Sequence, residues 1–240
     1  NSFCTLLRSR SRQFSPDDAE YHVVPFALPT TMTSEATTAA SSSSRLPPLT
    51  FLTKREETRA DPKVMGAVLE LNNRNVPAVN HLSMEDLLAI VGEARLFVVA
   101  VVTPEGDDAA DATTTMVAGY LICMADGAAY ASPNYLYFAQ RYKDTRDYLY
   151  VDRIVIDEPY HGKGLGKRLY GMVDALGAAV EAETGHPMRH LCCEVNVRPR
   201  NDQSLAFHAK CGFEEVGQQD VEGGSKTVSM LVRPIQAPAA

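Results

Sequence analysis

The sequence lacks two features that would point to common classes of protein. No apolar stretch approaches the length of a membrane-spanning segment, so we expect no membrane partner. Basic residues are outnumbered, with 23 Lys and Arg against 30 Asp and Glu and a net charge of −7. A sequence-independent nucleic-acid binder needs clustered basic residues to neutralise phosphates. We therefore expect no nucleic-acid partner either.

The sequence has few cysteines, and their spacing gives no framework for disulfides or for a metal. Five is an odd number, and the adjacent pair Cys192 and Cys193 could bridge only with strain. The same pair lacks the CxxC spacing and the nearby histidines of a zinc site. The sequence therefore predicts free thiols in a reducing compartment, such as the cytoplasm, and no metal.

The N-terminal stretch differs in composition from the rest of the chain. Three arginines precede any acidic residue, and residues 30–44 are almost entirely Ser, Thr and Ala. Such a composition buries too little apolar surface to fold. Its start is typical of a mitochondrial or plastid transit peptide, whereas Met32 is an alternative start for a cytoplasmic protein. We predict a disordered tail or targeting segment over residues 1–48 and one folded domain over 49–240.

The strongest local signal is a strand followed by a glycine-rich loop and a helix. Residues 148–156 are rich in β-branched and aromatic residues, which predicts a buried strand. Three glycines then alternate over HGKGLGK (161–167), just before an apolar pattern of helical spacing. Glycines let a ligand lie against the backbone N–H groups that a helix start leaves unpaired. The helix dipole and the lysines of the loop favour an anion there.

The loop therefore predicts a site for a pyrophosphate, although glycines also form ordinary turns between a strand and a helix. The mononucleotide loop needs four residues between its first glycine and Gly-Lys-Ser/Thr, and the dinucleotide fingerprint needs two residues between its second and third glycines. Neither spacing fits GKGLGK (162–167). Both of these nucleotide-binding classes are thus disfavoured.

The loop and a later helix resemble those of the GNAT superfamily, the acyl-CoA-dependent N-acetyltransferases. The family's loop runs Arg/Gln-x-x-Gly-x-Gly/Ala, which Gly164 and Gly166 match, while His161 stands where Arg or Gln is usual. Residues 201–213, NDQSLAFHAKCGF, are similar to the family's Asn-x-x-(Ala/Ser)-x-x-(Phe/Leu)-Tyr-x-x-x-Gly-Phe element. The resemblance covers about residues 49–235, and phrases such as SPNY and CEVN resemble a subgroup of predicted acetyltransferases.

The other patterns predict an α+β domain. Beside the strand and helix of the glycine loop, strands are predicted at 49–53, 95–103, 116–124, 189–195, 213–218 and 226–233, and helices at 62–72, from 83 onward and at 201–211. The resemblance implies the GNAT fold, in which helices flank a mixed central sheet and the central parallel strands splay apart.

Two connections have open interpretations. By resemblance, the linked first helices form one wall of the acceptor cleft, so residues 75–80 either touch substrate or form an Asn-rich turn. Residues 126–147 gather five aromatic side chains, which either cover an edge of the core or form a lid over the acceptor through Ser132 and Asn134. The acidic connection at 104–115 predicts only a surface loop.

The resemblance also implies acetyl-CoA as cosubstrate. Backbone groups of the central strand would pair with the pantetheine arm and the acetyl oxygen, the glycine loop would hold the pyrophosphate, and an asparagine would orient the arm. In this sequence these positions are Ile154, Val155 and Ile156 for the strand, His161, Gly162, Lys163, Gly164, Leu165, Gly166 and Lys167 for the loop, and Asn201 for the arm.

Three side chains are candidates for the chemistry. His208 stands at the position where many family members have a tyrosine as general acid, and an imidazolium is a competent proton donor. Tyr150 and water are the alternatives. A carboxylate at the cleft would be the base, and we favour Glu194 over Asp152. A pairing of Asp152 with Arg153 is not expected, because adjacent strand residues point to opposite faces.

The sequence thus predicts an N-acetyltransferase. It would transfer the acetyl group of acetyl-CoA to a primary amine, on a small molecule or a peptide, by direct attack of the amine. A non-catalytic acyl-CoA-binding regulator is the alternative. The chain would act as a monomer or a homodimer.

Overall fold

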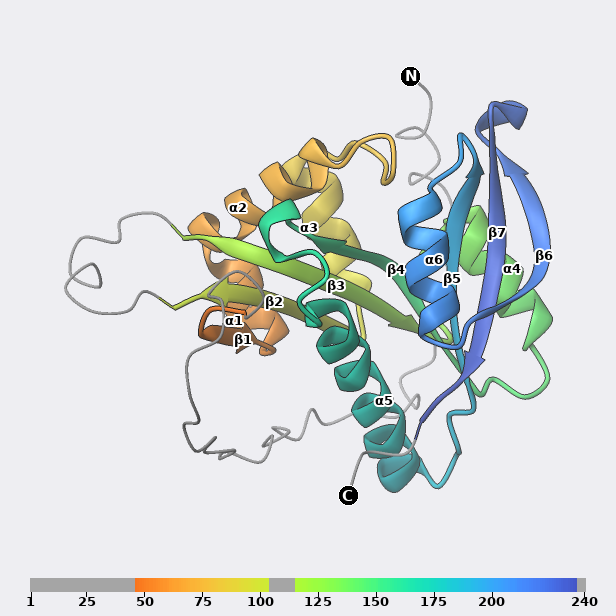
Figure 1. Ribbon diagram of the computed structural model, residues 1–240. Helices are drawn as coiled ribbons and strands as arrows, with labels where there is room; N and C mark the ends of the chain where they lie inside the picture. Colours follow the sequence, from red (N-terminus) through yellow and green to blue (C-terminus); the bar gives the residue numbers. More distant parts are fainter. Residues whose placement is uncertain (1–45, 104–114, 237–240) are drawn as a thin grey trace, which may run out of the picture. The chain divides into compact units, whose positions relative to one another are not determined.

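The structure is a computed structural model that describes residues 46–103 and 115–236 (Figure 1). These residues fall within one compact unit, residues 42–240. Most of the predicted tail and of the connection predicted at 104–115 therefore lies outside the described residues. In chain order the elements are β1 (Leu49–Leu52), α1 (Arg55–Ala60), α2 (Pro62–Arg74), α3 (Met84–Glu93), β2 (Leu96–Val102), β3 (Val117–Ala125), α4 (Pro133–Arg141), β4 (Tyr148–Ile156), the 3-10 helix η2 (Glu158–Tyr160), α5 (Leu165–Thr184), β5 (His190–Arg198), α6 (Asp202–Lys210), β6 (Glu214–Val221), the 3-10 helix η3 (Glu222–Gly224) and β7 (Lys226–Pro234).

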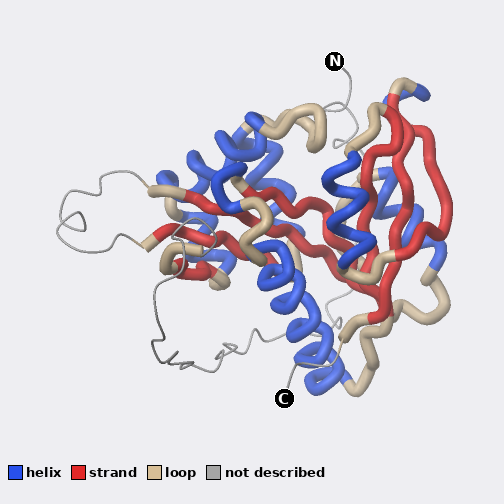
Figure 2. The backbone as a smooth tube through the Cα atoms, viewed as in Figure 1, coloured by secondary structure: helices blue, strands red, loops and turns tan. Residues whose placement is uncertain are grey.

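The strands form one mixed sheet in the order β1-β2-β3-β4-β5-β7-β6. All neighbours are antiparallel except β4 and β5, which are parallel. These two strands have nine residues each, yet they pair only over Tyr148–Tyr150 and His190–Cys192. Beyond that point they diverge, so the sheet divides into the two groups of strands seen in Figure 2. The predicted mixed sheet with splayed central strands is confirmed.

Helices cover both faces of this sheet (Figure 1). On one face α2, α3 and α4 contribute buried residues such as Val68, Leu87 and Phe138 to a hydrophobic core. On the other face Leu169 and Val173 of α5 belong to a second core. Each fully buried Val, Leu or Phe contributes about 1.5–3 kcal/mol, so the two cores hold the sheet between the helices. No helix among the described residues is both long and apolar enough to cross a membrane.

The starts of α2 and α3 follow from capping residues that the sequence shows. Asp61 accepts hydrogen bonds from the backbone N–H groups of Lys63 and Val64. Ser83 and Asp86 form a reciprocal capping box at the start of α3. These side chains satisfy donors that the first turn of a helix otherwise leaves unpaired.

The structure adds two α-helices that the sequence patterns did not predict. The short helix α1 is polar and buries only Thr58, so it has no apolar periodicity to detect. Helix α4 lies within the aromatic connection at 126–147, where Tyr135 and Phe138 are its buried residues. The predicted order of elements is therefore corrected: a helix precedes α2, and another separates β3 from β4.

Candidate active site

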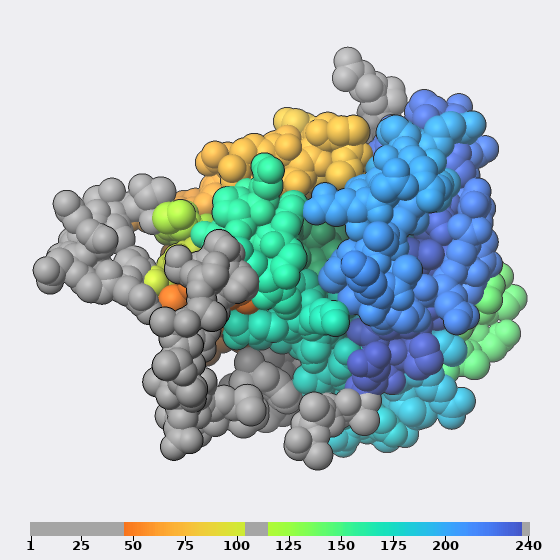
Figure 3. Space-filling model, in the orientation of Figure 1, coloured from red at the N-terminus to blue at the C-terminus, as the bar shows by residue number. Residues whose placement is uncertain are grey.

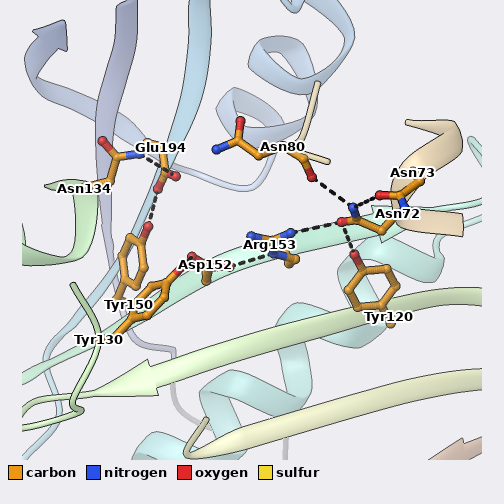
Figure 4. A network of polar contacts seen from close by, with 10 residues as sticks. All are labelled: Asn72, Asn73, Asn80, Tyr120, Tyr130, Asn134, Tyr150, Asp152, Arg153 and Glu194. Atoms are coloured by element: carbon orange, nitrogen blue, oxygen red, sulfur yellow. Dashed lines mark hydrogen bonds and ion pairs between the residues drawn. The ribbon is translucent and has the colours of Figure 1, made fainter. Parts of the chain in front are cut away.

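A network of polar side chains crosses the sheet where β4 and β5 separate (Figure 4). It extends from α2 and the connection after it to α4 and β5, and it lies on the face that α2, α3 and α4 cover. The residues drawn are Asn72, Asn73, Asn80, Tyr120, Tyr130, Asn134, Tyr150, Asp152, Arg153 and Glu194. Two of the sequence-predicted residues, Asp152 and Glu194, are thus brought into one site.

Asp152 and Arg153 are neighbours in β4 and nevertheless form an ion pair. The Nε of Arg153 lies 2.6 Å from Oδ2 of Asp152, and the two side chains are 8% and 4% exposed. The expectation that they point to opposite faces is wrong because of a β-bulge. Arg153 pairs with Ile122 and Val151 with Cys123, which leaves Asp152 as an extra residue between the paired positions. A bulge interrupts the alternation of side chains, so both can turn to the same face.

Arg153 also connects β4 with α2. Its Nη1 donates a hydrogen bond to Oδ1 of Asn72 over 3.0 Å, and the hydroxyl of Tyr120 donates to the same oxygen over 2.7 Å. The carboxylate of Asp152 in turn accepts a hydrogen bond from Tyr130 over 2.6 Å. The buried charges are therefore paired and hydrogen-bonded, which is the condition for keeping them inside a protein.

Glu194 is the carboxylate whose pKa is most useful for base chemistry. Oε2 accepts a hydrogen bond from the hydroxyl of Tyr150 over 2.8 Å, and Oε1 accepts one from Nδ2 of Asn134 over 2.9 Å. Burial, and then the negative charge of Asp152, raise the pKa of Glu194 from 4.5 to about 7, while the two hydrogen bonds oppose this shift. A carboxyl group with such a pKa both takes up and releases a proton near neutral pH.

The aromatic connection at 126–147 covers part of the core and also contacts the two carboxylates. Tyr135 and Phe138 are buried in the core, while Tyr130 and Asn134 reach the two carboxylates. Gln219 of β6 donates a hydrogen bond from Nε2 to Oδ1 of Asn134 over 3.1 Å. This contact turns the amide nitrogen of Asn134 toward Glu194. Tyr130 and Asn134 carry no periodic signal in the sequence, so only the fold reveals their contacts with the carboxylates.

The edge of β4 that faces β5 is open beyond Tyr150. The N–H of Asp157 donates to the carbonyl of Ala118 on β3 over 2.9 Å. Because bonding alternates along an antiparallel ladder, the backbone of Val155 faces β3, and the backbones of Ile154 and Ile156 face the open side. The backbone groups of Ile154 and the N–H of Ile156 therefore lie on the edge that β5 leaves open, while the carbonyl of Ile156 accepts a hydrogen bond from His161. Val155 is a correction: its backbone groups belong to the ladder with β3.

The glycine loop leads into an uncapped helix N-terminus through two glycines of positive φ. Gly162 and Gly164 have φ values of 71° and 87°, in the left-handed region that favours glycine. Gly164 is the N-cap of the twenty-residue helix α5, and no side chain caps that end. Lys163 and Lys167 flank it and form no ion pair with any described residue. The first N–H groups of α5 thus lie between two lysines in the chain.

Gly166 has a different role from the other two glycines. A Cβ at this position would lie 2.6 Å from Cζ of Phe207, so only glycine lets α5 approach α6 so closely. The two helices lie side by side on the face seen in Figure 3. The contact therefore sets the spacing of the helices behind the loop.

His161 makes hydrogen bonds within the protein and does not point its ring nitrogens into solvent. Its Nε2 donates to the carbonyl of Ile156 over 2.7 Å, and its Nδ1 accepts from Nε2 of Gln203 on α6 over 3.0 Å. Both ring nitrogens are occupied by protein partners. In this arrangement His161 connects the end of β4 and α6 to the loop, which is a structural contribution to the anion site.

His208 and Asn201 lie in α6 and at its start, against the opposite face of the sheet from Glu194. Asn201 caps α6 by accepting a hydrogen bond from the N–H of Ser204 over 3.0 Å. His208 is 3% exposed. Its Nδ1 donates to the carbonyl of Ser204, and its Nε2 accepts from the hydroxyl of Tyr170, both over 2.7 Å. Burial lowers the pKa of His208, so this arrangement suits a neutral imidazole.

No group of three or more His, Cys, Asp or Glu side chains suited to a metal ion occurs within residues 46–103 and 115–236. The four cysteines in this part of the chain are free thiols. The chemistry that the site offers is therefore that of paired carboxylates, phenol hydroxyls and backbone N–H groups beside an anion-binding loop.

Comparisons with known proteins agree with this geometry. Residues 104–213 match the model of the acetyltransferase (GNAT) family. The comparison with curated proteins found no match.

Several solved structures are similar over most of the chain. Ard1 from Thermoplasma volcanium is 16% identical, covering 78% of this chain and 98% of that one, with a TM-score of 0.52. NAA60 from Arabidopsis thaliana, in complex with acetyl-CoA, is 14% identical, covering 78% and 99%, with a TM-score of 0.54. A chain of the NatC complex bound to Gag peptide and CoA is 13% identical, covering 78% and 99%, with a TM-score of 0.52. At these identities the similarity shows the fold, and that fold is the GNAT fold.

Proposed function

We propose that this chain, which carries an acetyltransferase domain of the GNAT family, transfers the acetyl group of acetyl-CoA to a primary amine. The observation that carries the proposal is the position of Glu194. Its carboxylate, with a pKa raised to about 7, lies beside the point where β4 and β5 separate. Glu194 would therefore act as a base next to the open strand edge.

The residues present fit acetyl-CoA as cosubstrate. The uncapped start of α5, with Lys163 and Lys167, would hold the pyrophosphate, because helix N-termini and cations both favour anions. The backbone groups of Ile154 and the N–H of Ile156 on the open edge would pair with the amides of the pantetheine arm, since the carbonyl of Ile156 already accepts a hydrogen bond from His161. When bound, acetyl-CoA supplies an acetyl group activated as a thioester. Two solved neighbours contain acetyl-CoA or CoA, which supports the same assignment.

Glu194 would act as the general base. The acceptor arrives as an ammonium ion, and its proton passes to a carboxylate oxygen of Glu194, which leaves the nitrogen lone pair free to attack. General base catalysis of this kind contributes roughly 10²- to 10⁴-fold in rate. Burial, and then the negative charge of Asp152 beside Arg153, would keep the pKa of Glu194 near neutrality. Holding the two substrates together supplies much of the remaining acceleration.

Backbone and side-chain donors would complete the reaction. An N–H on the open edge of β4 would stabilise the negative charge that develops on the acetyl oxygen. The leaving thiolate needs a proton, and His208 is the donor implied by its position in the family pattern. To act, its ring would have to take up a proton at Nε2 and give up the hydrogen bond that it accepts from Tyr170. Tyr150 is the other candidate, since burial and then the charge of Glu194 raise its pKa well above 10 and keep its hydroxyl protonated.

The test is release of CoA thiol from acetyl-CoA over a panel of primary amines, with binding of acetyl-CoA measured separately by calorimetry. We expect turnover with at least one class of amine, and a loss of at least a hundredfold in kcat/KM for Glu194→Gln with acetyl-CoA affinity nearly unchanged. Glu70→Gln, at an exposed position of α2, is the matched control. Binding of acetyl-CoA without release of CoA under every acceptor would instead identify a non-catalytic acyl-CoA-binding regulator.

A further inference from the structure

The connection between α2 and α3, residues 75–83, is fixed by asparagine side chains. Asn73 accepts a hydrogen bond from the N–H of Leu82 and donates one to its carbonyl, each over 3.0 Å. Asn72 donates from Nδ2 to the carbonyl of Asn80 over 2.9 Å. The Asn-rich sequence thus forms an internally bonded turn.

Two side chains from the far half of the sheet hold the same connection. Asn196 of β5 donates from Nδ2 to the carbonyls of Pro77 and Ala78, over 3.1 and 3.5 Å. Lys226 of β7 donates from Nζ to Oδ1 of Asn80 over 2.8 Å. We call these contacts of Asn196 and Lys226 the latch. Because β4 and β5 have already separated at this level, the latch joins α2, on one half of the sheet, to strands of the other half.

The latch lies next to the proposed base. Glu194 and Asn196 are two residues apart in β5, so their side chains lie on the same face. Asn134 of α4 bonds Glu194 from the other side, and Tyr150 bonds it from β4. Glu194 is therefore bounded by α4, by β4 and by the latched connection.

Asn196 is 8% exposed, and the side chain of Lys226 is 12% exposed and also pairs with Glu222 over 3.0 Å. Breaking the latch would leave the buried amide of Asn196 without its partners, and it would remove one of the two partners of the Lys226 ammonium, which is costly. The connection is thus a fixed wall and not a flap that a large ligand can move aside at little cost.

We propose that the latch limits the acceptor to a small primary amine and excludes the end of a polypeptide. This inference rests on the proposed function. A polypeptide acceptor needs an extended groove for the residues that follow its amino group. Here β5 is bonded to the connection through Asn196 and to α4 through Glu194 and Asn134, so such a groove would require the latch to open.

The test compares kcat/KM for short alkylamines with kcat/KM for seven-residue peptides that have a free N-terminus, using the full chain and acetyl-CoA. We expect the wild type to prefer the amines at least tenfold. Asn196→Ala combined with Lys226→Ala should raise the peptide-to-amine ratio of kcat/KM at least fivefold, with acetyl-CoA affinity unchanged. Lys226→Met alone keeps the aliphatic packing and should shift the ratio in the same direction. This single variant provides the test if the double variant does not fold.

Lys210→Ala, at an exposed position of α6, is the matched control and should leave the ratio unchanged. A wild type that prefers peptides, or latch variants whose ratio equals that of the wild type, overturns the inference and leaves the proposed acetyl transfer intact. Turnover of neither amines nor peptides overturns the proposed function, and this inference with it. A merely structural latch would change stability without changing the ratio.

Discussion

The guanidinium of Arg153 lies 2.6 Å from the carboxylate of Asp152, its own neighbour in β4. The bulge that makes this contact possible also places a buried negative charge beside Glu194 and a positive charge against Asn72 of α2. One local irregularity of a strand thus sets both the electrostatics of the proposed base and the attachment of the wall of the site.

The pH profile of kcat/KM should show the titration of Glu194. The group must be deprotonated to accept a proton, so the rate should rise with pH through about 7, where burial and Asp152 place its pKa. In Glu194→Gln this limb should disappear together with most of the rate. A profile with the same limb in both proteins would assign the titration to the amine or to another group.

The titration of Glu194 should also make the free energy of unfolding depend on pH, with lower stability at higher pH. The pKa of Glu194 is about 7 in the folded protein against 4.5 for the free group, so folding favours its protonated form. That stabilisation is complete below pH 4.5 and is lost as pH rises through 7. Relative to Glu194→Gln, the wild type should therefore lose of the order of 3 kcal/mol across this range. Urea unfolding of both proteins at several pH values measures the difference.

Asn134 should tune the base without contacting the reacting atoms. Its amide hydrogen bond lowers the pKa of Glu194, so Asn134→Ala should move the acidic limb of kcat/KM to higher pH. Gln140→Ala, at an exposed position on the same helix, is the control and should not move it. An unchanged limb in Asn134→Ala would restrict Asn134 to packing α4 on the sheet.

Gly164 should be required for the affinity for acetyl-CoA. Its φ of 87° is one that residues with a Cβ rarely adopt, although no atom lies within 4 Å of where a Cβ would stand. Gly164→Ala should therefore distort the start of α5 and weaken binding at least tenfold by calorimetry. Gly171→Ala, within α5 and equally uncrowded, should bind like the wild type. If both variants bound acetyl-CoA with equal affinity, the glycine loop would not be the pyrophosphate site.

The donor role proposed for His208 requires a protonated ring, and burial holds its pKa below the usual 6.5. Together with a base that titrates near 7, it predicts a narrow bell-shaped pH profile of kcat. His208→Ala should remove the alkaline limb of this bell and lower kcat by roughly tenfold or more, and His208→Tyr should restore part of the rate. Single-turnover kinetics must show that chemistry limits the rate. If the wild type and His208→Ala share both limb and rate, His208 serves only to bond Tyr170, and Tyr150 or water supplies the proton.

Local sequence patterns predicted most of the framework. Two such features are the alternating glycines before α5 and the capping residues Asp61 and Ser83. They act through residues nearby in the sequence, so they can be predicted from the sequence alone. The contacts of Tyr130 and Asn134 with the carboxylates depend on how α4 packs, which no local pattern encodes.

The expected alternation of side chains along a strand failed at the β-bulge in β4. The bulge at Asp152 has no mark in the sequence, so the ion pair with Arg153 was not expected. The contact of His208 with Tyr170 depends on how closely Gly166 lets α5 and α6 approach. Such packing between distant segments cannot be predicted from a local sequence pattern.

The short pairing of β4 with β5 leaves the sheet unfinished at its centre. The backbone groups of Ile154 and the N–H of Ile156 have no strand to bond, so a ligand that lies along this edge would take the place of a further strand. Such a ligand adds to folding stability by mass action, by about 2.7 kcal/mol at a hundred times its Kd. The bound cosubstrate would thus stabilise the fold, and the free energy of unfolding would rise with the concentration of acetyl-CoA.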